Sequence, residues 1–243
     1  TTVPPVQRSN IRGCILGGAI GDAMGAPIEF MSLDAIRQRW GPRGPASYVE
    51  VAGRRGFVTD DTQMTLWTTE GLIRAHNRAP RGVSNPLYVV WRSYLRWLHT
   101  QGAPADWVAE GDDWGGANTG WLIQRRELFD IQAPGDTCLS ALRSGMPGGI
   151  TVDGYPPGSS RSSWARLNTS KGCGRVMRVA PVGLLSGDPF EFACEIAALT
   201  HGHPSGYLAA GTFARIVGEV ARGSSIADAV VAAGRELKRW PGH

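Results

Sequence analysis

The sequence predicts an all-α fold, and three observations support this prediction. Apolar residues recur at helical spacing in most segments of the chain. Patterns that alternate apolar and polar residues are scarce, and residues 47–51 offer at most an edge strand. Glycine and proline are dense over residues 41–56, 111–120 and 145–158, which we therefore expect to be loops between helices.

The first expected helix covers residues 11–25 and carries a stripe of small residues. Gly13, Gly17, Gly21 and Gly25 recur every four residues, so they share one side of the helix. Such a bare stripe lets another backbone approach closely, at a cost of roughly 1 kcal/mol per glycine relative to alanine. We therefore expect a buried helix at the centre of the fold.

The second expected helix covers residues 62–76, where apolar residues fall on neighbouring helical rows. Asp60 and Asp61 come just before it, and carboxylates there suit the positive end of the helix dipole. Further helices are expected over residues 86–99, 121–130, 136–144, 189–200, 207–222 and 226–240. The last should be capped by Ser225 and bury the side formed by Ile226, Ala229, Val230, Ala233 and Leu237.

Composition limits the class of protein. The 243 residues are 42% hydrophobic and 19% charged, so we expect one domain over residues 1–243 with a sizeable core and no disorder. Of the 25 basic residues only Lys171 and Lys238 are lysines, and the arginines are scattered rather than gathered in a nucleic-acid-binding stripe. The longest apolar run starts near Ile11 and meets Asp22, which is too short for a membrane span. We expect neither a specific nucleic acid nor a membrane as a partner.

The four cysteines, Cys14, Cys138, Cys173 and Cys194, form no CxxC pair. At this chain length such a set indicates reduced thiols rather than a disulfide framework. The sequence also has no basic segment followed by an apolar one, as a secretion signal would have. We therefore expect a cytoplasmic protein.

The strongest candidate for chemistry is the segment Thr59-Asp60-Asp61-Thr62. Adjacent carboxylates flanked by hydroxyls form an oxygen-only cluster, which is the ligand type that Mg²⁺ and Mn²⁺ prefer. Two neighbouring anions at a helix start also repel each other unless a cation or solvent compensates. The same residues are equally typical of an exposed helix cap with a spare aspartate, so both interpretations stay open.

Glu29 follows a glycine-punctuated apolar run, so we expect it at the end of the first helix and close to the interior. A carboxylate there can serve proton transfer or hold a metal. It can equally be a buried carboxylate whose hydrogen bonds are satisfied. Asp22, earlier in the same helix, is expected to be a helix-packing or capping group.

Residues 168–178 form a glycine-broken segment before an apolar stretch. Its backbone N–H groups, together with Ser170 and Lys171, can bind a phosphate, although a tight turn would have the same sequence features.

His201 and His203 share one short loop, but the other ligands of a zinc site are not nearby in the sequence. A polar contact with a ligand or a structural turn is the expected role of this pair. Asp112 and Asp113 lie in a loop rich in glycine and tryptophan, and we expect them to be solvated.

In this order and at these separations, four segments resemble the ADP-ribosylglycohydrolase family. They are GCILGGAIGDAMGAPIEF, TDDTQMTLWTTEGL, SKGCGRVMRVAPVGLL and LTHGHPSGYLAAG, and the similarity runs over residues 8–222. The resemblance implies an all-helical fold and hydrolysis of the glycosidic bond between ADP-ribose and a protein side chain. It also implies an ADP-ribosylated protein or an ADP-ribose derivative as the partner, with arginine-linked ADP-ribose favoured.

By this resemblance, Thr59, Asp60 and Asp61 supply one half of a site for two Mg²⁺ or Mn²⁺ ions. Glu29 corresponds to an acidic residue beside the metals, and Glu29, Asp60 and Asp61 are the candidate catalytic residues. The resemblance also implies a set of substrate contacts in the glycine loop and the histidine turn, namely Ser170, Lys171, Gly172, Cys173, Gly174, Met177 and His203.

Members of the family carry a second acidic motif of the form Asp-x-Asp-Thr/Ser near the C-terminus, which completes the metal site. After Asp228 this sequence has no such motif, and its last acidic residue is Glu236. We therefore expect a C-terminally incomplete domain that lacks its last helices and binds one ion or none. The alternatives are a module that binds ADP-ribose without cleaving it and a scaffold protein of the same fold.

Overall fold

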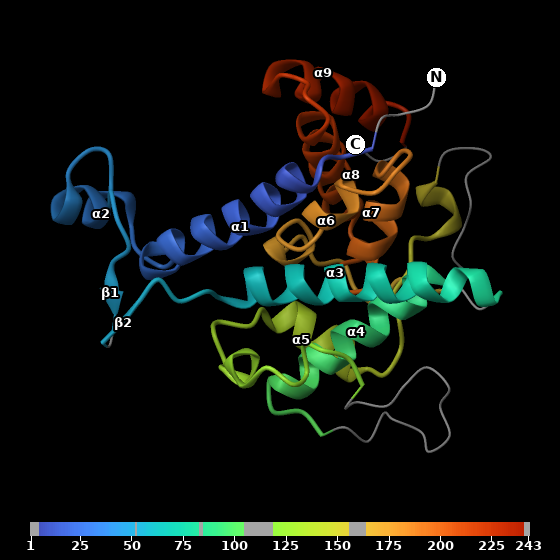
Figure 1. Ribbon diagram of the computed structural model, residues 1–243, viewed down its shortest axis with the longest axis horizontal. Helices are drawn as coiled ribbons and strands as arrows, with labels where there is room; N and C mark the ends of the chain where they lie inside the picture. The colour runs from blue at the N-terminus through green and yellow to red at the C-terminus, as the bar shows by residue number, and fades with distance from the viewer. Residues whose placement is uncertain (1–4, 52, 83–84, 105–118, 156–163, 241–243) are drawn as a thin grey trace.

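The computed structural model describes residues 5–51, 53–82, 85–104, 119–155 and 164–240. Within these ranges the chain forms nine α-helices and one two-stranded hairpin, which confirms the all-α prediction (Figure 1). The helices are α1 (Arg8–Gly25), α2 (Leu33–Trp40), α3 (Asp60–Arg78), α4 (Pro86–Thr100), α5 (Asp136–Arg143), α6 (Ala180–Gly183), α7 (Phe190–Ala198), α8 (Pro204–Ala221) and α9 (Ile226–Leu237). Strand β1 (Glu50–Val51) pairs antiparallel with β2 (Arg54–Arg55).

Two elements differ from the sequence-based expectation. Helix α2 was not expected, and none of its residues is buried. Residues 121–130 were expected to be a helix but form only a 3₁₀ turn, Arg126–Phe129. The pair Asp112 and Asp113 lies outside the described residues, so the expectation that it is solvated stays a prediction.

Helix α3 runs through the middle of the molecule, with α4 and α5 on one side and α6, α7 and α8 on the other (Figure 1). Trp67 of α3 and Trp97 of α4 are both 0% exposed and belong to one hydrophobic core. Gln63 joins the same two helices because its Oε1 accepts a hydrogen bond from Trp97 Nε1 at 3.0 Å. Burial of one large apolar side chain contributes on the order of 2–3 kcal/mol, so these contacts hold α3 firmly in place.

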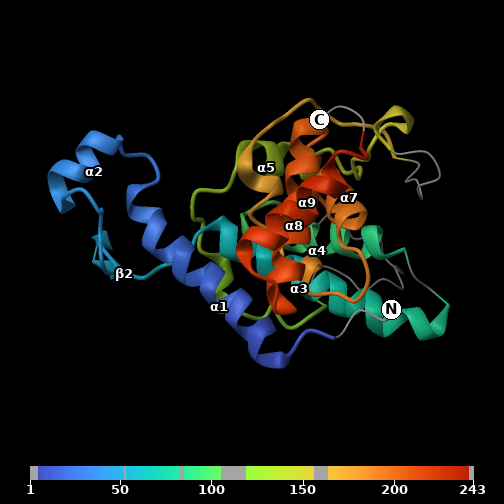
Figure 2. The same ribbon diagram turned by 90° about the horizontal axis from the view of Figure 1, so that it is seen from above.

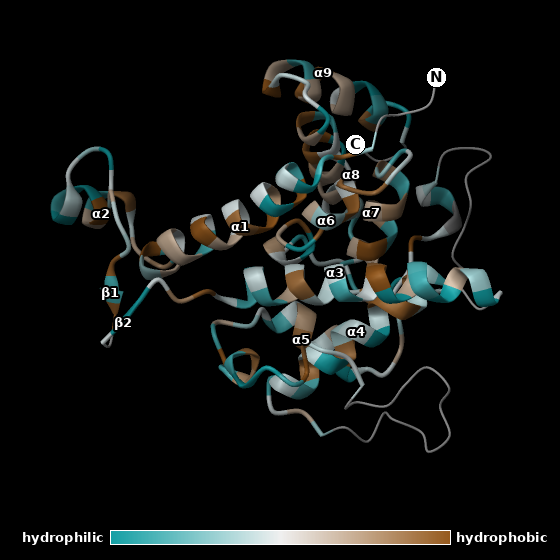
Figure 3. Cartoon of the chain, viewed as in Figure 1, coloured by the Kyte–Doolittle hydropathy of each residue, from teal (hydrophilic) through white to brown (hydrophobic). Residues whose placement is uncertain are grey.

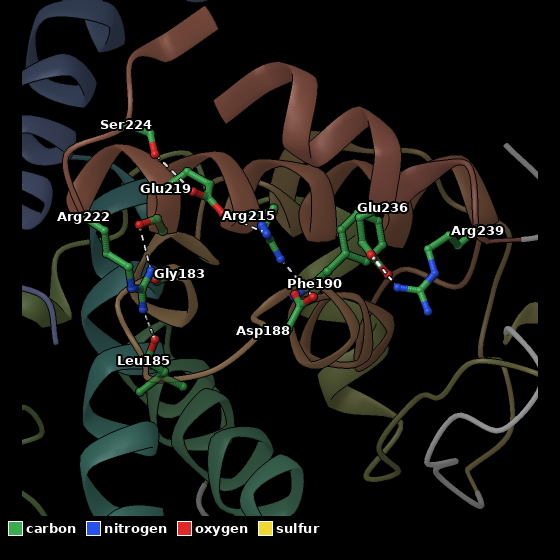
Figure 4. Close-up of polar contacts among 11 residues, drawn as sticks. Gly183, Leu185, Asp188, Phe190, Arg215, Glu219, Arg222, Ser224, Glu236 and Arg239 are labelled. Atoms are coloured by element: carbon green, nitrogen blue, oxygen red, sulfur yellow. Dashed lines mark hydrogen bonds and ion pairs between the residues drawn. The ribbon is translucent and has the colours of Figure 1, made fainter. Parts of the chain in front are cut away.

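Polar contacts tie α8 to the segment between α6 and α7 (Figure 4). Arg215 forms ion pairs with Asp188 at 2.9 Å and with Glu219, one helical turn later, at 2.8 Å. Arg222 donates to the carbonyl oxygens of Gly183 at 3.2 Å and Gly218 at 2.7 Å. The C-terminal half of α8 is therefore fixed to the core by side chains as well as by apolar packing.

Helix α1 is not the buried central helix that the glycine stripe predicted. Figures 1 and 2 show that it runs away from the other helices and carries α2 and the hairpin at its far end. Ala23 is its only buried residue. A Cβ placed on Gly13, Gly17 or Gly21 would have no neighbouring atom within 4 Å, apart from its own helix and adjacent residues. Helix α1 contacts α3, α6 and α8, but within the described chain none of their atoms lies close to these three glycines.

Helix α9 begins as expected but buries fewer residues than expected. Ser225 Oγ accepts a hydrogen bond from the Asp228 N–H at 3.1 Å, which confirms the predicted cap. On the expected buried side, Ala229 and Ala233 are 0% exposed, and Leu237 packs partly buried against the core. Ile226 and Val230 are 71% and 51% exposed, so that part of the prediction was wrong. Figure 3 shows apolar residues along α1 and α9, and Leu16, Ile20 and Val231 among them are exposed.

The four cysteines are free thiols, as expected. In the described part of the chain no single helix is long and apolar enough to cross a membrane. Helix α1 with its following turn and α2 would reach the required length and composition together, but the pair is bent by 97°.

Candidate active site

Asp22 of α1 fixes the beginning of α3. Its carboxylate accepts hydrogen bonds from the backbone N–H of Thr59 at 2.8 Å and of Thr62 at 3.2 Å. The hydroxyls of the same two threonines also donate to it, at 2.8 and 2.6 Å. A carboxylate at the positive end of a helix satisfies N–H groups that lack an intrahelical partner. Asp22 is thus a capping group, as expected, and the helix that it caps is α3.

The two aspartates of the motif point to different places. Asp60 is 6% exposed, and its Oδ2 accepts a hydrogen bond from the Gly135 N–H at 3.1 Å. Asp61 is solvent-accessible and lines a cleft beside α1. Thr59 Oγ1 donates its proton to Asp22 Oδ1, so a lone pair of this oxygen remains able to coordinate a cation.

The carboxylates lie close enough for their charges to interact. Burial raises the pKa of Asp60 to about 7, against the lowering effect of the Gly135 N–H, and Asp61, Glu29 and Asp22 raise it further. Desolvation by the cleft walls raises the pKa of Asp61 to about 6, with Asp22 and Glu29 adding to the effect. Clustered carboxylates that raise each other's pKa are stabilised in the ionised form by a bound cation.

The cleft has a volume of about 520 Å³ and lies between α1 and the start of α3. Glu29 lines it but is exposed, so the expectation that Glu29 lies close to the interior was wrong. Glu29 comes after the 3₁₀ turn Ala26–Ile28, which follows α1 and has no buried residue. The bare side of α1 forms one wall, and the lining includes Gly17, Gly18, Gly21, Gly25, Asp22, Glu29, Thr59, Asp61, Thr62, Thr65 and Met177.

The glycine loop lies next to this cleft. Thr65 Oγ1 of α3 donates to the Met177 carbonyl oxygen at 2.9 Å, and Met177 itself lines the cleft. Burial raises the pKa of the Cys173 thiol, and the nearby Asp61 charge raises it further. The loop and the acidic segment, which are more than 100 residues apart in the sequence, therefore meet at one place.

Ser170, Lys171 and His203 do not line the cleft and have other surroundings. Ser170 Oγ lies 3.1 Å from Thr137 Oγ1 of α5, and Lys171 is exposed. His203 caps α8, because its Nδ1 accepts a hydrogen bond from the Ser205 N–H at 3.1 Å. Desolvation and then the charges of Lys171, Arg166 and Arg175 lower the pKa of His203. This end of the loop is positively charged, which suits an anionic ligand.

The space in which a side chain of residue 172 or 174 would lie is occupied by neighbouring residues. A Cβ on Gly174 would lie 2.7 Å from Cys138 Sγ and 3.2 Å from the His201 ring, and a Cβ on Gly172 would lie 3.2 Å from His201 Nε2. His201, which was expected with His203 to make a polar contact with a ligand or a structural turn, thus lies against both glycines.

The oxygen donors are of the kind that a hard divalent cation binds, but too few of them converge to complete its coordination shell. Thr59, Asp60, Asp61 and Glu29 offer hydroxyl and carboxylate oxygens, which Mg²⁺ and Mn²⁺ prefer. Across the described ranges, however, no three carboxylate, imidazole or thiolate groups converge as a ready set of ligands. The residues could thus contribute part of a coordination shell, and water or substrate oxygens would have to supply the rest.

Fold and cleft together define an all-helical protein in which acidic oxygen donors line a cleft that Met177 of the glycine loop also lines. The family model described as ADP-ribosylglycohydrolase matches residues 4–242. The chain belongs to the ADP-ribosylglycohydrolase family.

Two relatives show how far the similarity extends. The chain is 26% identical over 218 residues to the ADP-ribosyl-(dinitrogen reductase) glycohydrolase of Rhodospirillum rubrum, a match that covers 88% of this chain and 58% of the relative. It is 38% identical over 70 residues to an uncharacterized protein of Archaeoglobus fulgidus, covering 28% of this chain and 22% of that protein. The chain therefore spans less than two thirds of the length of either relative.

Proposed function

We propose that this chain carries the main part of the site of a metal-dependent hydrolase that removes ADP-ribose from modified protein side chains. Arginine-linked ADP-ribose is the favoured substrate, because one relative is named for ADP-ribosyl-dinitrogen reductase. The observation that carries the proposal is the cleft in which Glu29 and Asp61 lie beside Met177 of the glycine loop. Family membership supports the same class of reaction.

Thr59, Asp60 and Asp61 are the proposed ligands of Mg²⁺ or Mn²⁺. When bound, such an ion would polarise a water molecule and orient ribose hydroxyls. Asp22 holds the Thr59 hydroxyl in place, as its hydrogen bonds indicate. Glu29, at the cleft mouth, is proposed to move the proton, either from the attacking water or to the leaving group, in a reaction that passes through an oxocarbenium-like state.

The glycine loop is the proposed binding site for the diphosphate of ADP-ribose. The backbone N–H groups of Cys173 and Gly174, in the 3₁₀ turn Cys173–Arg175, are the proposed donors to its phosphate oxygens. Lys171 and His203 would add a charge and a ring N–H, and Ser170, Gly172 and Met177 would shape the surface around the ligand. In this proposal the sugar lies toward the carboxylates.

The double variant Asp60→Asn with Asp61→Asn tests the proposal. We expect it to lose metal-dependent release of ADP-ribose from an arginine-modified protein while its far-ultraviolet circular dichroism is unchanged. Asp34→Asn is the matched control, because Asp34 is also an acidic residue in the first turn of a helix but is exposed on α2. Release by the double variant at the rate of the control would contradict the assignment of the site.

A module that binds ADP-ribose without cleaving it is the second candidate, and the absence of a ready three-ligand set in the described residues favours it. Calorimetry with ADP-ribose, run beside the release assay, separates the two functions. Binding without release would support the module, and binding with release would support the hydrolase.

A further inference from the structure

Residues 30–51 and 53–57, which we call the arm, project from the rest of the molecule beside the cleft. The arm contains α2 and the β1–β2 hairpin, and Figures 1 and 2 show it at the far end of α1. It begins directly after Glu29, which lines the cleft, and it ends two residues before Thr59, which also lines the cleft. A substrate too large for the cleft would therefore meet the arm.

A groove with a volume of about 400 Å³ lies between the end of α1 and the arm. Gly25 and Ile28 line both the groove and the cleft, so the two depressions are neighbours. Leu33 and Ile36 of α2 supply apolar side chains to the groove. A Cβ added to Gly44 would lie 3.7 Å from Ile36 Cγ2, which shows that the turn after α2 folds back onto that helix.

The groove carries positive charge that the described chain does not neutralise. The arm holds five arginines and two acidic residues. Arg37 and Arg43 line the groove and are exposed, and within the described ranges neither of them forms an ion pair. Arg54 of the hairpin, in contrast, pairs with Asp130 at 2.5 Å. Two guanidinium groups without a counter-ion beside one groove attract carboxylates, to which each can donate two parallel hydrogen bonds.

The arm also exposes large apolar side chains. Phe30 is 85% exposed, and Leu33, which lines the groove, is 57% exposed. The guanidinium of Arg39 lies 4.6 Å from the centre of the Trp40 ring. Apolar and aromatic side chains with arginines beside them are typical of surfaces that bind other proteins. The arm therefore fits a protein segment that combines acidic with apolar residues.

We propose that the arm binds an acidic segment of the ADP-ribosylated protein, close to the modified side chain that enters the cleft. Carboxylates of this segment pair with Arg37 and Arg43, and its apolar side chains pack on Phe30 and Leu33. The proposal rests on the proposed function, because it assigns the cleft to the modified side chain. It adds a preference for particular target proteins, which contacts with ADP-ribose alone do not provide.

The double variant Arg37→Glu with Arg43→Glu tests the charge of the groove. The substrates are two peptides of equal length that carry one ADP-ribosylated arginine, flanked by glutamate and leucine in one and by glutamine and leucine in the other. We expect kcat/KM of the unaltered chain to be about tenfold higher for the glutamate peptide. The double variant should lose this preference through a higher KM. A preference that persists in the variant would overturn the proposal.

Two controls distinguish docking on the arm from damage to the cleft. Release from ADP-ribosylated free arginine, which has no flanking segment to place on the arm, should be equal in the double variant and the unaltered chain. The variant Arg235→Glu with Lys238→Glu reverses the same number of charges at exposed positions in and just after α9, and it should keep the preference. If the double variant loses as much activity on free arginine as on the glutamate peptide, the two arginines of the groove have a structural role and the proposal fails.

Binding of the glutamate peptide without ADP-ribose, measured by fluorescence anisotropy, tests the arm without catalysis. We expect a Kd about tenfold weaker for the double variant than for the α9 variant, and weaker binding of the unaltered chain at higher salt. If the unaltered chain releases ADP-ribose from no substrate, the proposed function fails, and this measurement still decides whether the arm binds an acidic segment. Equal Kd values for the two variants would overturn the proposal.

A second copy of the chain and a nucleic acid are the alternative occupants of the groove. Sedimentation that shows a dimer of the unaltered chain and a monomer of the double variant would assign the groove to a second copy. A single-stranded oligonucleotide that binds more tightly than the glutamate peptide, and is released by the double variant, would assign it to a nucleic acid. Either result would overturn the proposal.

Discussion

Helices α1 and α8 are equal in length, at 18 residues, and both are rich in glycine, but they have opposite surroundings. On α8 a Cβ added to Gly211 would lie 2.4 Å from Cys194 Sγ and 2.8 Å from the Phe190 carbonyl oxygen. On α1 a Cβ added to Gly13 would meet nothing within 4 Å. Glycine in α8 thus permits helix packing, whereas glycine in α1 leaves a bare wall beside the cleft.

The largest effect on the free energy of unfolding is expected at Gly211, which is enclosed by neighbouring atoms. Gly211→Ala should lower the free energy of unfolding by about 3 kcal/mol, because the new methyl group must displace Cys194 and the backbone of α7. Chemical denaturation followed by circular dichroism measures the change. A loss below about 1 kcal/mol would mean that α7 and α8 separate easily and that the contrast with α1 is small.

The second-largest effect on stability is expected at Asp22, which joins α1 to α3. Asp22→Asn should cost about 2 kcal/mol, because an amide cannot accept all four of the hydrogen bonds that reach Asp22 and carries no charge for the start of α3. Under the proposed function, this variant should also weaken Mg²⁺ binding. Asp34→Asn on α2 is the control, and equal stability of the two variants would show that Asp22 does not join α1 to α3.

Glu195 in the core is expected to contribute to the pH dependence of stability, in addition to Asp60 and Asp61 at the cleft. Burial raises the pKa of Glu195 on α7 to about 7, against the lowering effect of a hydrogen bond from Tyr155 Oη at 2.9 Å. The folded chain therefore holds a proton that the unfolded chain releases near pH 4.5, and stability should fall as pH rises from about 4.5 to about 7.

Glu195→Gln should remove this part of the pH dependence and stabilise the chain by about 1–2 kcal/mol near pH 8. Denaturant titrations at several pH values give the slope. The same slope in the variant and in the unaltered chain would assign the effect to another group.

The smallest effect, and one of opposite sign, is expected on α1. Gly13→Ala should stabilise the chain by about 0.5–1 kcal/mol, because alanine favours a helix and the site has open space around it. Gly13 does not line the cleft, so ligand binding should be unchanged. Destabilisation by this variant would indicate that another surface covers α1 in solution.

The sequence predicted helices well where their apolar residues repeat and a start signal is present. Ser225 before α9 and the aspartates at the start of α3 are examples. It could not predict the burial of α1, because a stripe of small residues suits both a neighbouring backbone and an open cleft. Only the tertiary arrangement distinguishes these two cases.

The residues of the acidic motif were predictable from the sequence, but the orientations of their side chains were not. Asp60 turns toward Gly135 while Asp61 lines the cleft, although the two are neighbours in the chain. These directions depend on contacts with segments far away in the sequence. The same holds for His201, which lies against Gly172 and forms a hydrogen bond with Thr200.

The two walls of the cleft differ in how firmly they are anchored, and this difference should affect ligand binding at high temperature. One wall belongs to α1, which has a single buried residue, and the opposite side begins on α3, which is anchored in the core. Warming should detach α1 before the tryptophan-rich interior melts. The capacity to bind ligand should therefore vanish several degrees below the main calorimetric transition, and cooling should restore it.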